Sequence, residues 1–154
     1  MKEQKYVGKY SCQLVRESVK NDFTEYNITS PDEAAETIRK LTGIHKSPSE
    51  KMVVLMFNTK LKVLGWSLVS SGGLTATHGE PREVFRTAIL ANAFAILISH
   101  NHPSGNVEPS EEDKLLTKRL VEAGEILGIR VLDHIIISDE GYTSIKEEFS
   151  DLIK

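Results

Sequence analysis

The sequence contains a single cysteine, Cys12, among its 154 residues. A lone cysteine forms no internal disulfide bond, and it excludes the cysteine-rich class of zinc site.

Long basic runs and long apolar runs are also missing. A formal net charge of -3 gives the chain no general attraction to nucleic acid or to anionic membranes, so we do not expect DNA binding. The apolar runs stay far below the ~20 residues that span a bilayer. The first residues, Met1–Lys5, include no apolar signal region. These features together predict a cytoplasmic protein.

What the sequence does have is the composition of a globular domain, with 40% hydrophobic and 27% charged residues. We expect one domain over residues 1–154, large enough to bury a core. Its divergent N-terminal part, 1–50, is predicted to hold one or two strands over 5–28 and a helix. That helix begins at Ser30-Pro31 and ends at Gly43, and a surface loop follows over 44–50.

The segment 52–147 alternates between strand and helix patterns and is the expected core. Strands are predicted over 52–57, 61–70, 94–99, 131–137 and 142–145, and helices over 81–91, over 110–127 and after 146. The first two strands are joined by a short turn and must be antiparallel, so the sheet is mixed. The fold class is therefore α/β, a sandwich around a mixed sheet.

Residues suited to metal binding gather where strand 94–99 ends. His100 and His102 can face one ion, because alternate residues of an extended chain point to the same side. Ser110 is a natural N-cap and places Asp113 in the first helical turn, where the helix field keeps the carboxylate ionised. Two imidazoles and one carboxylate suit zinc, and three protein ligands leave a position open for water, as in catalytic zinc sites.

Each part of this pattern also has a simpler explanation. Ser-x-x-Asp is a helix-capping pattern, and histidines at a strand end are commonly surface or packing residues. Their conjunction at the carboxyl end of a buried strand favours the metal site, because such ends are preferred positions for sites in α/β sheets.

The same residues resemble a known family. His100-x-His102-Pro103, seven further residues to Ser110, and then x-x-Asp113 are similar to the motif of JAMM (JAB/MPN-plus) metal domains. Similarity to the RadC-like branch extends over roughly residues 52–147, through the segments 81–83, 108–110 and 131–134.

This resemblance implies a three-layer sandwich of the cytidine-deaminase-like (JAB/MPN) type, with helices on both faces of the sheet. It also implies one Zn²⁺ per chain, held by His100, His102 and Asp113. By the same resemblance, Ser110 helps to hold the tetrahedral intermediate of amide hydrolysis.

One residue of the family pattern is missing from its expected place. Active peptidases of the family carry a general acid/base glutamate on an early core strand, and its position falls at Ser67, whose hydroxyl is no base at neutral pH. No Asp or Glu occurs between Glu50 and Glu80. Glu80 and Glu83, at the start of helix 81–91, are the two acids that could replace it. Glu80 is the freer candidate, because Pro-Arg-Glu also occurs in family members that keep the glutamate, which gives Glu83 a structural or capping role. The alternative is that both are solvated acids at a helix N-terminus.

Two functions are consistent with these residues. The first is a zinc-dependent metallohydrolase of the metallopeptidase type, cleaving amide or isopeptide bonds in a peptide or protein substrate. The alternative is a zinc-binding interaction domain without turnover, which the missing glutamate supports. Nucleobase deamination needs His-x-Glu and Pro-Cys-x-x-Cys, which a single cysteine excludes.

The other histidines and the only tryptophan have less specific predictions. His134 is expected in the core, paired with backbone or with Asp133. His78 is a candidate for contact with a metal ligand or the substrate, His45 is expected to be exposed, and Trp66 is expected in the core or lining the cleft.

Overall fold

The structure is a computed structural model that describes residues 11, 28–72 and 79–154. The strands predicted over 5–28 therefore lie almost entirely outside the described residues, and His78 lies outside them as well.

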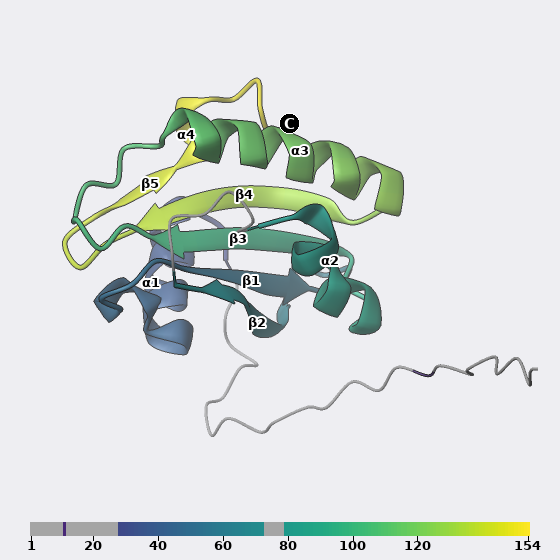
Figure 1. Ribbon diagram of the computed structural model, residues 1–154. Helices are drawn as coiled ribbons and strands as arrows, with labels where there is room; N and C mark the ends of the chain where they lie inside the picture. The colour runs from purple at the N-terminus through teal and green to yellow at the C-terminus, as the bar shows by residue number, and fades with distance from the viewer. Residues whose placement is uncertain (1–10, 12–27, 73–78) are drawn as a thin grey trace, which may run out of the picture.

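A mixed sheet of five strands forms the centre of the described part, in the order β2-β1-β3-β4-β5 (Figure 1). The strands are β1 (Lys51–Phe57), β2 (Val63–Ser71), β3 (Ala95–Asn101), β4 (Arg130–Ile137) and β5 (Tyr142–Ser144). β1 is antiparallel to both β2 and β3, β3 is parallel to β4, and β4 is antiparallel to β5. The predicted mixed sheet is confirmed.

The helices follow the predicted positions. They are α1 (Pro31–Thr42), α2 (Pro81–Leu90), α3 (Glu111–Leu127) and α4 (Ile145–Glu148). In α1 the Ser30 side chain accepts a hydrogen bond from the Glu33 amide, and the helix ends at Gly43, whose φ of 64° costs a residue without a Cβ little.

Two hydrophobic clusters lie on opposite faces of the sheet and make three layers. α1 buries Ala34, Ala35 and Ile38 against one face. α2 and α3 bury Val84, Phe85, Ala88 and Leu120 against the other face. Figure 1 shows α3 running alongside β4. The α/β sandwich with helices on both faces is thus confirmed.

The segment 44–50 is more ordered than the predicted surface loop. It contains a 3-10 turn, η2 (Ile44–Lys46), and Ile44 is buried in the cluster beneath α1. The segment ends with Glu50, directly before β1. Its path is therefore fixed by the core at one end and by the sheet at the other.

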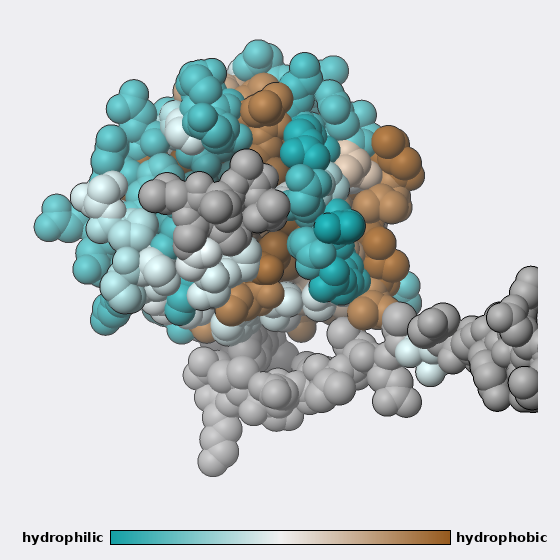
Figure 2. All heavy atoms as spheres, in the orientation of Figure 1, coloured by the Kyte–Doolittle hydropathy of each residue, from teal (hydrophilic) through white to brown (hydrophobic). Residues whose placement is uncertain are grey.

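The two ends of the sheet differ in polarity. Because β1 is antiparallel to β3, the start of β1 meets the end of β3, and Met52 lies opposite His100. The other end, where α2 and α3 finish, exposes Ile89, Leu90, Ile126 and Leu127. Figure 2 shows hydrophobic residues gathered toward that end and hydrophilic residues toward the other. None of the described helices has the length and apolar character that crossing a bilayer requires.

Candidate metal centre

His100, His102 and Asp113 come together at the carboxyl end of β3. The Nε2 atoms of the two imidazoles are 3.0 Å apart. Asp113 Oδ1 lies 3.1 Å from Nε2 of His100, and Asp113 Oδ2 lies 3.6 Å from Nε2 of His102. Three candidate donor groups from a strand, the following turn and a helix therefore face one point.

These separations fit a metal ion. A tetrahedral zinc with bonds of about 2.0–2.1 Å keeps its ligand atoms ~3.3 Å apart. The two Nε2 atoms are 3.0 Å apart and Oδ1 of Asp113 is 3.1 Å from Nε2 of His100, both slightly below that value. Two nitrogens and a carboxylate also form a donor set that zinc accepts.

The start of α3 holds Asp113 in place. Ser110 donates its backbone N–H and its hydroxyl to Oδ2 of Asp113, at 2.8 and 2.6 Å, and its Oγ accepts from the Asp113 amide at 3.1 Å. Oδ1 remains directed at His100. Burial by itself raises the pKa of Asp113, but the two imidazoles beside it and the Ser110 hydroxyl outweigh burial and hold that pKa well below its usual range. The carboxylate is therefore ionised.

His102 is oriented by the turn that follows it. Its Nδ1 donates to the carbonyl oxygen of Asn106 at 2.7 Å, because a carbonyl can only accept. This bond directs Nε2 toward His100 and Asp113. The hydrogen bond to Asp113 raises the pKa of His102 against the burial that lowers it, so the position favours a positive charge.

Glu50 is the residue of this cluster that our sequence reasoning missed. One carboxylate oxygen of Glu50 and one ring nitrogen each of His100 and His102 all lie within 4.8 Å of one another, so the group could hold a metal ion. The available signal was an acid directly before a buried strand. Only the antiparallel pairing of β1 with β3 brings that acid to the histidines.

Asn101 fixes the segment that carries Glu50. Its side chain is fully buried. Oδ1 accepts from the Lys51 amide at 2.8 Å, and Nδ2 donates to the carbonyls of Ser47 and Ser49 at 3.3 and 3.2 Å. The residue between the two histidines therefore ties both sides of Glu50 to the end of β3.

Glu80 and Glu83, the two acids considered for the general base, have other partners, and Ser67, at the expected position of the family's glutamate, does as well. Glu80 pairs with Arg119 at 3.0 Å, and Glu83 pairs with Arg86 at 2.6 Å. Ser67 lies opposite Val54, two residues further along β1 than Met52, and its Oγ is 3.2 Å from that of Thr87. Met52, the residue opposite His100, is paired in β2 with Ser70, so Ser67 lies three residues away along β2 from the position level with His100.

His134 is buried and hydrogen-bonded as predicted, but its side chain has other partners. Its Nε2 lies 2.8 Å from Nδ1 of His100, and its Nδ1 lies 2.6 Å from Oγ1 of Thr117. Asp133 instead accepts from the backbone amide of His134 at 2.6 Å. Complete burial lowers the pKa of His134 to about 3, so its ring is neutral at pH 7.

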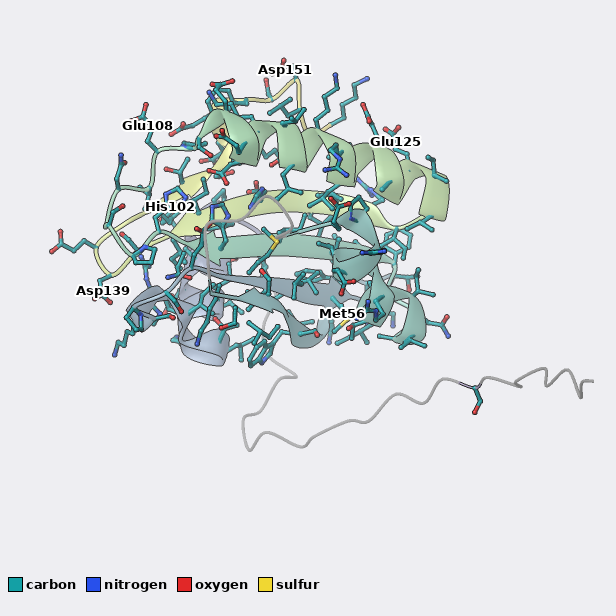
Figure 3. All side chains as sticks on the ribbon, viewed as in Figure 1. Met56, His102, Glu108, Glu125, Asp139 and Asp151 are labelled. Carbon is teal, nitrogen blue, oxygen red and sulfur yellow. The ribbon has the colours of Figure 1, made fainter. Side chains whose placement is uncertain are left out.

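A cleft of about 420 Å³ opens beside His102. Its walls are the segments 45–48, 102–105 and 138–140. Figure 3 shows His102 at the same end of the molecule as Asp139, with Glu125 at the far end. His45, predicted to be simply exposed, is half-buried and lines this cleft, and its burial lowers its pKa. Trp66 is half-buried and packs against the cluster beneath α1.

Comparison with known families agrees with this geometry. A family model described as a RadC-like JAB domain matches residues 28–150. The chain belongs to the RadC-like JAB domain family. The match covers every helix and strand described above, and it includes both histidines, Asp113 and Glu50.

Bacterial relatives of this RadC-like JAB domain are named UPF0758 proteins. One from Symbiobacterium thermophilum is 49% identical over 98 residues, 64% of this chain and 42% of the relative. One from Alkaliphilus metalliredigens is 44% identical over 133 residues, 86% of this chain and 56% of the relative. The chain thus spans about half the length of the curated relatives it matches.

Proposed function

We propose that this RadC-like JAB domain is a zinc-dependent metallohydrolase that cleaves amide or isopeptide bonds in a peptide or protein substrate. The observation that carries the proposal is the approach of the Glu50 carboxylate to the paired histidines, all within 4.8 Å, at a centre that also contains Asp113. Such a site has metal ligands and a separate carboxylate, which is what hydrolysis at a metal requires.

The metal-binding part of the proposal uses three side chains. His100 and His102 supply Nε2 atoms, and Asp113 supplies Oδ1, the oxygen that Ser110 leaves unbonded. Zinc bound there supplies a Lewis acid that polarises a carbonyl and lowers the pKa of a water ligand to about 7.

Glu50 has the role of general base and then general acid in this proposal. Its carboxylate takes a proton from the attacking water as the C–O bond forms, and it returns that proton to the leaving nitrogen as the C–N bond breaks. Asn101 limits the movement of the backbone on both sides of Glu50, so the carboxylate stays beside the two histidines.

Ser110 remains the proposed donor to the tetrahedral intermediate. Its hydroxyl is bonded to Asp113 Oδ2 in this structure. To stabilise an oxyanion, that hydroxyl has to turn from Asp113 toward the substrate, while the Ser110 amide keeps Asp113 in position.

The alternative, a zinc-binding domain without turnover, rested on the absence of an acid from strand 61–70. Glu50, the residue directly before β1, lies beside the histidines and offers the acid that strand 61–70 lacks, which favours the hydrolase. The cleft beside His102 further supports a substrate-binding role.

The decisive experiment compares Glu50→Gln with Glu80→Gln in zinc-loaded protein. With a panel of peptides and isopeptide-linked substrates, we expect Glu50→Gln to lower kcat by about 10²–10⁴-fold while its zinc content stays at the wild-type level. Glu80→Gln is the matched control, because Glu80 is paired with Arg119, and we expect it to keep wild-type kcat.

Wild-type protein that binds zinc and cleaves nothing on the panel would contradict the hydrolase proposal and favour the interaction domain. Equal activity of Glu50→Gln and wild type would remove Glu50 from the mechanism.

A further inference from the structure

A continuous chain of hydrogen bonds links helix α3 to the ligand His100. Thr117 Oγ1 lies 2.7 Å from the carbonyl oxygen of Asp113, one turn earlier in α3. The same Oγ1 lies 2.6 Å from Nδ1 of His134, and Nε2 of His134 lies 2.8 Å from Nδ1 of His100. All of these side chains are buried.

The direction of each bond in this chain follows from its first member. A carbonyl oxygen can only accept, so the single hydroxyl proton of Thr117 is donated to Asp113. Thr117 must then accept from His134, which places a proton on Nδ1 of His134. The His134 ring is fully buried, which disfavours a second, charging proton, and its Nε2 is therefore an acceptor.

The last bond determines the tautomer of His100. Nε2 of His134 accepts from His100, so the His100 proton is on Nδ1. The lone pair of His100 is then on Nε2, the nitrogen that lies 3.1 Å from Asp113 and 3.0 Å from Nε2 of His102. A reversed chain would place a proton on this nitrogen and block it as a ligand.

We propose that Thr117 and His134 are positioning residues for the metal ligand His100, acting through a one-way hydrogen-bond chain that keeps Nε2 of His100 free of its proton. The inference deepens the proposed function at its metal-binding step and does not depend on hydrolysis. It also gives α3 two separate tasks, because the helix carries one ligand and sets the tautomer of another.

The chain is tested by zinc affinity, measured by competition with a chromogenic chelator. Thr117→Val keeps the shape of the side chain and removes the hydroxyl, and His134→Phe removes both ring nitrogens. We expect each to raise the zinc Kd by about 10–100-fold. Thr117→Ser keeps the hydroxyl, and His134→Gln keeps an acceptor for His100, so both are expected to change the Kd by less than about tenfold.

Thr37→Val is the matched control, since Thr37 is a buried helical threonine in α1, on the opposite face of the sheet. We expect it to keep the wild-type Kd. Circular dichroism confirms folding of every variant. Folded Thr117→Val and His134→Phe with wild-type affinity would overturn the inference and would leave the hydrolase proposal standing.

A second measurement needs no variant. Long-range ¹H–¹⁵N spectra of the zinc-free wild-type protein report which ring nitrogens carry protons. We expect both His134 and His100 to be protonated on Nδ1. A proton on Nε2 of His134 would overturn the inference even if the variants fail to fold.

Discussion

Asp113 and Asp133 are both buried, but their surroundings differ. Asp133 accepts from the Ser144 hydroxyl at 2.6 Å and from the amides of His134 and Lys146 at 2.6 and 3.1 Å. Asp113 is bonded through Oδ2 to Ser110, and its Oδ1 faces His100. Both oxygens of Asp133 thus accept from hydroxyl or amide donors, whereas Asp113 directs one oxygen at His100.

The pKa values of the two acids move in opposite directions. Burial raises the pKa of Asp133 even though three donors oppose the shift, while the paired histidines hold the pKa of Asp113 well below its usual range. Burial alone therefore does not reveal the role of an acid. The informative feature is the kind of neighbour: Asp133 meets hydroxyl and amide donors only, whereas Asp113 also meets two imidazoles.

Alanine variants of the two acids should separate these roles most strongly. Asp113→Ala removes one of the three proposed ligands, so we expect the zinc Kd to rise by more than about 100-fold, beyond the effect of losing an indirect partner. Zinc titration against a competing chelator measures this change.

Asp133→Ala is the counterpart and should act on stability. It leaves the Ser144 hydroxyl and two amides without their acceptor, which we expect to lower the free energy of unfolding by about 2–4 kcal/mol. Urea denaturation measures the loss. A folded Asp133→Ala protein with zinc affinity reduced as far as in Asp113→Ala would break the comparison.

Asn101 lies between two proposed ligands, but it resembles Asp133 because its polar atoms all have hydrogen-bond partners. Asn101→Ala removes bonds to Ser47, Ser49 and Lys51, so we expect about 1–3 kcal/mol of destabilisation. Hydrogen exchange at the Lys51 amide should accelerate most. Unchanged exchange at Lys51 would show that the 47–51 segment is held by other contacts.

The smallest expected effect concerns pH. The pKa of Asp133 is raised in the folded protein, so its protonated form adds to the free energy of unfolding. This contribution is complete below the unfolded-state pKa of about 3.8, and it is lost as the pH rises through the folded-state pKa. Asp133→Asn keeps an acceptor for both amides and does not titrate. Urea denaturation in zinc-free buffers, from below the unfolded-state pKa to above the folded-state pKa, should therefore show a smaller loss of stability with rising pH for the variant. An equal loss in both proteins would contradict a raised pKa for Asp133.

The sequence predicted local features well because their causes are local. Ser30 and Gly43 mark the ends of α1, and Ser110 caps α3 as predicted. The prediction that His100 and His102 face one side needed only the alternation of an extended strand, and their Nε2 atoms are 3.0 Å apart.

Features that depend on strand order could not be predicted in this way. The sequence pairs 52–57 with 61–70 through a short turn, but it does not state that β1 also pairs with β3. That second pairing brings Glu50 to the histidines. Similarly, His134 meets His100 only because β4 lies beside β3 with these residues on one face.

The three bonds of Asn101 have a consequence for how the sheet assembles. If β1 slid along β3 by one residue, its side chains would change faces, and the Lys51 amide would move away from the Asn101 oxygen. The amide group would then be buried without partners. The residue between the two histidines thus makes misaligned pairing costly, so the correctly aligned sheet and the candidate metal centre form together.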